Sequence, residues 1–200
     1  MKKSLLFIGN NATFMDSMAI RLLSVFDIQL CLAEEHKRED DDIGVRFWEP
    51  SSYLSAKTVV GSYMRKQHPE QVVLLFSPHK EDFTDFSVKS IEEACDSWIK
   101  GWLFILKELE PFLYKDAIML TFVLDTRKRE DSIINFFLEK SFFYLADRYL
   151  EKQNDGFSVR AVIYSSDLES ELCDFISDLQ VPRKSKKWQY IPKKRGFLGI

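Results

Sequence analysis

Carboxylates are the densest set of side chains in this sequence that could do chemistry. They gather in one stretch and comprise Glu34, Glu35, Asp40, Asp41, Asp42 and Glu49. Oxygen ligands so close together could hold a divalent cation. Basic residues interrupt the stretch, however, and charged runs of this kind usually face water. We interpret the stretch as a solvated loop and expect no metal site.

A second candidate is Lys140, which lies in the middle of a strongly apolar segment, residues 132–150. Large apolar residues recur around nearly the whole circumference of the helix that this segment predicts. Such a helix must be covered by protein on nearly all sides. A lysine in this setting commonly runs its stem along apolar surface and keeps its ammonium group in water, which is the plain interpretation of Lys140.

The composition is that of a globular protein, with 46% hydrophobic and 30% charged residues in a 200-residue chain. This length suits one domain, to which we assign residues 1–182. No apolar run is long enough to predict a membrane span. Cys31, Cys95 and Cys173 lie far apart in apolar stretches, so we expect buried thiols and a cytoplasmic location rather than disulfides or zinc ligands.

The last residues, 183–200, form a basic tail. Seven of the 28 basic residues lie there and no acid does, which leaves 21 basic against 31 acidic residues in the rest of the chain. Contact with nucleic acid or an anionic membrane is one interpretation. We favour a tail that folds back on the acidic body, with residues 188–191 as an edge strand.

Strands and helices alternate along the chain. Apolar periodicity predicts helices over 13–24, 50–66, 90–113, 132–150 and 168–179, and strands over 4–8, 28–33, 45–48, 72–76, 118–124 and 159–163. This alternation favours an α/β fold in which helices cover both faces of a parallel sheet.

Several positions resemble the short-chain dehydrogenase/reductase (SDR) family. Lys140, Gly156 and Val159 match its pattern Tyr-x-x-x-Lys followed by Gly and Val, and Gly101 and Pro111 match positions in its preceding long helix. The resemblance implies a Rossmann-like doubly wound parallel sheet in three layers, α/β/α. It also implies an NAD or NADP cofactor and an oxidoreductase site built from Tyr, Lys, Ser and Asn.

The cofactor-binding positions depart from the family. Its first turn reads Gly-x-x-x-Gly-x-Gly, of which Gly9 matches the first glycine while Thr13 and Met15 replace the others. These side chains add bulk where the chain must turn tightly and where the cofactor would approach. Residues 75–78 likewise replace the small residues that make room beside the adenine ribose. We therefore expect no cofactor, with NAD or NADP as the alternative.

The catalytic positions depart further. Phe136 stands in place of the tyrosine, Val123 of the serine and Trp98 of the asparagine, so only Lys140 matches. In the family the tyrosine passes a proton, the lysine lowers its pKa and the serine positions the substrate. General acid–base help of this kind contributes ~10²–10⁴-fold to the rate. A site without these groups should retain little activity.

The two long helices predicted over 90–113 and 132–150 carry more large apolar residues than one sheet can cover. An exposed apolar patch of that size is not expected on a soluble monomer. The family pairs these helices with their symmetry mates, so we expect a homodimer. The expected interface residues are Trp98, Trp102, Phe104, Ile105, Phe137, Leu138, Phe142, Tyr144 and Leu145.

We interpret the protein as a catalytically inactive SDR-like protein, a pseudoenzyme, with a structural or regulatory role as a dimer. One alternative is an active NAD(P)-dependent oxidoreductase of the family, because the order of elements still fits. Another is a receiver-like signalling domain, since a strand that ends at Gly9 before a helix would also begin such a domain. An unidentified protein partner is compatible with the first interpretation, and we do not expect nucleic acid as a partner.

Overall fold

The computed structural model describes residues 2–33, 43–77, 86–116, 118–127, 132–153, 157–165, 167, 169–179 and 187–191. Most of the predicted carboxylate loop, Glu34, Glu35 and Asp40 to Asp42, lies outside these residues, as do Pro78 and Gly156. Glu49 is described and is exposed.

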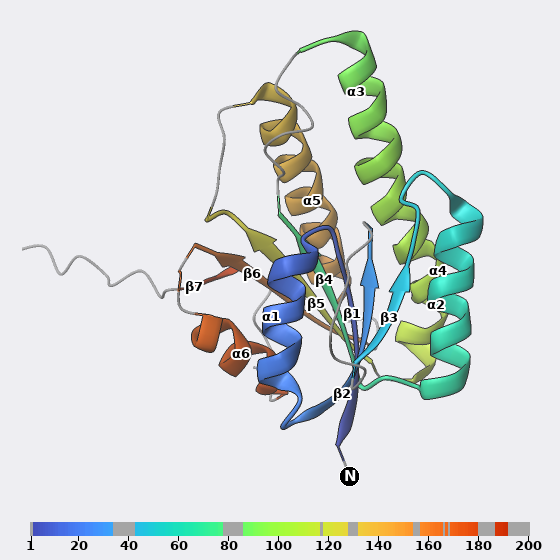
Figure 1. The fold of residues 1–200 in the computed structure, drawn as a ribbon, viewed down its shortest axis with the longest axis vertical. Coiled ribbons are helices and arrows are strands. Elements are labelled where there is room, and N and C mark those ends of the chain that lie inside the picture. The colour runs from blue at the N-terminus through green and yellow to red at the C-terminus, as the bar shows by residue number, and fades with distance from the viewer. Residues whose placement is uncertain are drawn as a thin grey trace, which may run out of the picture.

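Seven parallel strands form one sheet in the order β3-β2-β1-β4-β5-β6-β7 (Figure 1). The strands are β1 (Lys3–Gly9), β2 (Phe26–Leu32), β3 (Gly44–Phe47), β4 (Gln71–Phe76), β5 (Met119–Asp125), β6 (Ser158–Tyr164) and β7 (Gln189–Ile191). The order is the doubly wound one, which confirms the predicted fold class. It differs from the 2-1-3-4-5 order of receiver-like folds, so the receiver-like alternative is wrong.

Helices cover both faces of the sheet (Figure 1). They are α1 (Ala12–Leu22), α2 (Tyr53–Gln67), α3 (Val88–Ala94), the π-helical turn η1 (Cys95–Ile99), α4 (Lys100–Asp116), α5 (Ile133–Lys152) and α6 (Glu169–Ser177). One core cluster lies between the sheet and α1 with α6, and the other between the sheet and α2, α4 and α5. The long helix predicted over 90–113 is the continuous run α3–η1–α4.

The middle of the sheet is apolar on both faces. Every residue of β4 and β5 is buried, as expected for parallel strands that are covered on both sides. Alternate side chains enter the two clusters: Phe122 and Leu124 face α5, whereas Val123 faces α1 and α6. A shift of one residue along a strand therefore changes the face on which a side chain lies.

Side-chain caps fix where the helices begin. The side-chain oxygen of Asn11 accepts a hydrogen bond from the backbone N–H of Phe14 at 3.1 Å, which satisfies one free donor at the start of α1. Ser132 caps α5 in the same way through the N–H of Asn135. Because α1 begins at Ala12, directly after β1 ends at Gly9, its N-terminus lies at the carboxyl end of that strand.

The sheet continues past residue 182, where sequence placed the end of the domain. β7 pairs in parallel with β6, and the carbonyl of Ile191 accepts a hydrogen bond from the backbone N–H of Ser165. Beside it, the ring of Trp188 stacks on Phe143 and its indole N–H donates to Asp147 at 3.0 Å. The expected edge strand near residues 188–191 is confirmed.

Within the described residues, the helices are too short or too polar to qualify as candidate membrane spans.

Candidate functional site

The sheet order reverses between β1 and β4, and we call the space at the carboxyl ends of these two strands the crevice. The chain leaves β1 toward β2 on one side, and β4 lies on the other side of β1. In doubly wound folds a ligand binds where the order reverses in this way, with its phosphates at the N-terminus of the first helix. The residues that decide its chemistry are those that follow β1, β4 and β5.

Gly9 ends β1 under a tightly packed side chain. A Cβ atom at this position would lie 2.6 Å from the sulfur of Met15 and 2.8 Å from the carbonyl oxygen of Leu75. Met15 is fully buried in the core cluster beneath α1. This placement corrects the expectation that Met15 projects into the crevice: it fills the space between α1 and the sheet instead, because its position faces inward on the helix.

Asn10 and Ser77 tie the end of β1 to the end of β4. The amide nitrogen of Asn10 donates to the carbonyl of Ser77 at 2.7 Å, and its amide oxygen accepts from the Ser77 backbone N–H at 2.8 Å. Both residues are buried. The pair closes the floor of the crevice between the two strands where the order reverses.

Asp125 carries this network to the end of β5. Its carboxylate accepts a hydrogen bond from the hydroxyl of Ser77 at 2.8 Å and two from the Arg127 guanidinium, each at 2.9 Å. Burial alone would lower the pKa of Arg127, but its hydrogen bonds to Asp125 and the charge of that carboxylate raise the pKa above its ordinary value. Arg127 therefore keeps its positive charge beside this carboxylate.

Arg127 also reaches the first turn of α1. Its guanidinium carbon lies 3.8 Å from the ring centroid of Phe14 and 4.8 Å from that of Tyr164. The two rings are stacked at 5.6 Å. The Tyr164 hydroxyl is buried without a hydrogen-bond partner among the described residues, and burial raises the pKa of Tyr164 to about 12. Ring stacking and cation–π attraction thus hold Arg127 against α1.

The side chains present do not fit a dinucleotide in this crevice. A pyrophosphate needs free backbone N–H groups and close approach at the start of α1. Here Phe14 and Arg127 pack against that turn, and Asp125 places a carboxylate beside them. Among the described residues, Asn10, Ser77, Asp125 and Arg127 form one connected hydrogen-bond network.

The residues that sequence aligned with the catalytic set are not brought together. Val123 is buried on the face of the sheet opposite α5, so a hydroxyl group there would point away from that helix. Phe136 is 50% exposed on α5, and Lys140, which is partly exposed, lies over its ring at 5.1 Å. The structure therefore corrects both alignments, because these positions turn away from the crevice.

A different polar pair on α5 faces the sheet. Asn135 and Glu139 are both buried, and they share one helical stripe with Phe142 and Ala146, which belong to the core. Their spacing equals that of the Tyr-x-x-x-Lys pattern, displaced by one residue. Neither side-chain atom of Asn135 has a partner in the described part of the chain. An amide and a carboxylate stand here where the family carries a phenol and an ammonium group.

The nine residues expected at the dimer interface divide into three groups by burial. Trp102, Ile105, Leu138 and Phe142 are buried in the core of the single chain, so they cannot meet a partner directly. Phe137 and Tyr144 are exposed, whereas Trp98, Phe104 and Leu145 are partly buried. The dimer itself stays a prediction, with a narrower set of residues.

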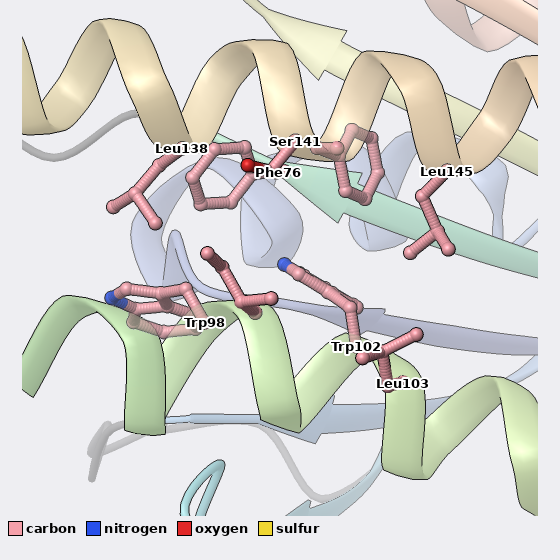
Figure 2. A pocket seen from close by; sticks show the side chains of 9 residues that line it. Phe76, Trp98, Trp102, Leu103, Leu138, Ser141 and Leu145 are labelled. Atoms are coloured by element: carbon pink, nitrogen blue, oxygen red, sulfur yellow. The ribbon is translucent and has the colours of Figure 1, made fainter.

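Trp98 lies in η1, at a small cavity between α4 and α5 (Figure 2). Its ring is 6.1 Å from that of Phe76 and 6.4 Å from that of Trp102. Trp98 therefore belongs to the packing between the two helices.

Sequence reasoning missed the residues that form the crevice network. Asn10 and Ser77 directly follow two buried strands, and Asp125 ends a third. Because the carboxyl ends of parallel strands share one edge of the sheet, polar residues at these three points could have been grouped from sequence alone. Arg127 and Phe14 carried no such signal, since their contact depends on how the chain turns after β5.

Comparisons with known proteins agree with this fold. No family model and no curated protein sequence matches the chain. Among solved structures, a short chain dehydrogenase from Mycobacterium smegmatis is similar with a TM-score of 0.71 at 11% identity, over 97% of this chain and 93% of that one.

Two further structures extend the comparison. An oxidoreductase of the short chain dehydrogenase/reductase family from Brucella ovis, in complex with a partially ordered NAD, has a TM-score of 0.70 at 11% identity over 95% of this chain and 99% of that one. Serine dehydrogenase from Escherichia coli has a TM-score of 0.64 at 12% identity over 90% and 92%. The chain therefore has the SDR-like fold, as its sequence predicted.

Proposed function

We propose that this protein is a catalytically inactive protein of SDR-like fold that serves a structural or regulatory role as a homodimer. One observation carries the proposal. The network of Asn10, Ser77, Asp125 and Arg127 closes the crevice in which the fold binds its ligand, and Arg127 packs on Phe14 at the start of α1.

The chemistry of α5 supports the same proposal. The position nearest to the family tyrosine in sequence, Phe136, has no proton to transfer and faces outward. The pair that faces inward, Asn135 and Glu139, lacks the phenol that passes the proton and the ammonium group that lowers its pKa. A buried amide cannot replace a general acid, because its pKa lies far outside the range that proton transfer needs.

The dimer is supported by the exposed side of α5 and α4. A helix that sequence predicts to be covered on nearly all sides has four large apolar residues in the open, and α4 adds one beside them. They are Ile133, Phe136, Phe137, Tyr144 and Leu103. Clustered exposed apolar groups mark interaction surfaces, and a twofold axis would let two copies of this surface cover each other.

The thiols are compatible with the cytoplasm. Cys31 and Cys173 are free and buried, and burial raises the pKa of their thiols to about 12 and about 11. Thiols of this kind react slowly because little thiolate forms. A reducing compartment is where unpaired cysteines are common.

The alternative function is an NAD(P)-dependent oxidoreductase. It is favoured by the fold and by the NAD that the Brucella ovis structure contains. Titration of NADH and NADPH with the protein, followed by nucleotide fluorescence, separates the two functions. We expect no saturable enhancement up to ~100 μM protein, because at ~10 μM affinity the signal would be nearly saturated there. Saturation at micromolar protein would favour the oxidoreductase.

A further inference from the structure

A small apolar cavity lies between α4 and α5, on the face of the sheet opposite α1. It has a volume of about 60 Å³. Phe76 forms its floor from β4, Trp98 and Trp102 line it from the η1–α4 run, and Leu138 and Leu145 from α5 (Figure 2). Four of its nine lining residues are aromatic, and the Trp102 ring lies 5.2 Å from Phe142.

One polar donor inside this wall has no partner. The side chain of Trp102 is buried, with the residue only 3% exposed, and its indole N–H meets no acceptor anywhere in the described residues. Figure 2 shows the indole nitrogen on the edge of the ring that points into the space between the helices. A buried donor without an acceptor costs free energy, so an oxygen atom from a ligand would be stabilising here.

A second polar group stands on the opposite wall. The hydroxyl of Ser141, on α5, donates to the carbonyl of Phe137 at 2.8 Å, which leaves its oxygen able only to accept. On the other helix, the π-helical turn η1 places Trp98 and Ile99 at the cavity. Turns of this type within α-helices occur frequently at functional sites.

We propose that this cavity binds a small apolar molecule with one acceptor oxygen. This oxygen accepts a hydrogen bond from the indole N–H of Trp102. The cavity is smaller than the ~150 Å³ apolar cavity that takes up benzene. The ligand is therefore a short aliphatic ketone, ether or alcohol. One chain alone lines the cavity, and the proposal does not depend on the closed crevice. Leu103 and Leu145 in its lining also belong to the face that we propose for the dimer.

Butan-2-one is the probe, and the indole N–H signals in a ¹H–¹⁵N spectrum are the measurement. Four tryptophans give four such signals, which Trp→Phe variants assign. We expect a saturable shift of the Trp102 signal with a midpoint near ~1 mM, because so few atoms make contact. Trp48 is the internal control, since its indole N–H is also buried and unpartnered but does not line the cavity.

The variant Leu145→Phe adds volume inside the cavity. It should raise the butan-2-one concentration at the midpoint by about tenfold or more, because an overfilled site leaves no space for the ligand. Leu54→Phe, on the exposed side of α2, is its matched control and should bind as the wild type does. The isosteric hydrocarbon 2-methylbut-1-ene should not shift the Trp102 signal downfield, because it has no acceptor.

Three results would overturn the proposal: no saturable shift of Trp102, an equal shift of Trp48, or an unchanged midpoint in a folded Leu145→Phe protein. An equal downfield shift with the hydrocarbon would refute the acceptor contact. If Leu145→Phe does not fold, Ser141→Val replaces it as the test variant. Valine at this position narrows the cavity from its partly exposed wall and should also raise the midpoint concentration of butan-2-one.

Discussion

The guanidinium of Arg127 donates to both carboxylate oxygens of Asp125, two residues earlier in the chain, with each nitrogen–oxygen distance at 2.9 Å. The backbone N–H of Arg127 donates to the same carboxylate at 3.1 Å. The chain therefore turns back on itself directly after β5. This turn brings the arginine over Phe14, on a helix more than a hundred residues away in sequence.

Removal of the arginine should destabilise the fold. Arg127→Met leaves the buried carboxylate of Asp125 without its ion partner, and we expect the free energy of unfolding to fall by ~3 kcal/mol. Urea denaturation measures it. The control is Arg148→Met, which breaks an exposed pair with Glu151 and should cost less than ~0.5 kcal/mol. If both variants lose the same free energy of unfolding, the Arg127–Asp125 pair stabilises the fold no more than the exposed Arg148–Glu151 pair does.

Tyr164→Phe should be neutral or stabilising. The Tyr164 hydroxyl is buried without a partner in the residues described, whereas its ring stacks on Phe14 and contacts Arg127. Phenylalanine keeps the ring and removes the unsatisfied group, which should raise the free energy of unfolding by up to ~1 kcal/mol. A loss above ~1 kcal/mol in thermal or urea unfolding would mean that the hydroxyl has a partner in solution.

The same hydroxyl should make stability fall at alkaline pH. Burial raises the pKa of Tyr164 to about 12, and the pKa values of Tyr63 and Tyr149 also rise to about 12, again chiefly through burial. Above pH 10 the unfolded chain releases these protons while the folded chain holds them. The stability that these protonated tyrosines contribute is therefore complete below pH 10 and is lost as the pH rises toward 12. Tyr164→Phe should lessen this loss of stability. If the free energy of unfolding depends on pH identically in the variant and the wild type, the raised pKa of Tyr164 is contradicted.

Phe136→Tyr should not produce reductase activity. Phe136 is half exposed and lies beside Lys140 on the outer side of α5, so the restored hydroxyl would face solvent. Spectrophotometric assays with NADH or NADPH and a generic carbonyl substrate should show no turnover above the background. Asn135→Tyr, on the inward stripe, is the companion variant, and turnover by either protein would sink the pseudoenzyme interpretation.

Charge on the exposed side of α5 should split the proposed dimer. Phe137 is 51% exposed, and Phe137→Glu would bury a carboxylate in the interface without a partner. Light scattering at tens of micromolar should give a dimer mass for the wild type and about half of it for the variant. Leu54→Glu, on α2, should leave the mass unchanged. A wild type that scatters as a 23.5 kDa monomer would refute the dimer.

The fold was predictable because strands and helices differ in apolar period. The buried run of β4 and the alternation of elements place every strand within about two residues of its observed ends. Even the short strand β7 followed from the apolar residues inside the basic tail. What sequence did not indicate is that β7 extends the domain, since a strand of three residues depends on β6 for its hydrogen bonds.

The site was less predictable because small shifts rotate side chains through large angles. One residue on a helix is about 100°, which separates outward Phe136 and Lys140 from inward Asn135 and Glu139. A helix that is apolar on all sides gives no signal to choose between them. On β5 the same one-residue ambiguity moved the expected serine position to Val123, on the wrong face of the sheet.

A crystal structure determined after soaking with a saturating concentration of NADH or NADPH tests the central claim most directly. The density beside Gly9 and the first turn of α1 is the observation. We expect no nucleotide density there. The Arg127 guanidinium should still donate to the Asp125 carboxylate and pack against Phe14. Pyrophosphate density at the start of α1, with Arg127 displaced from Asp125, would contradict it.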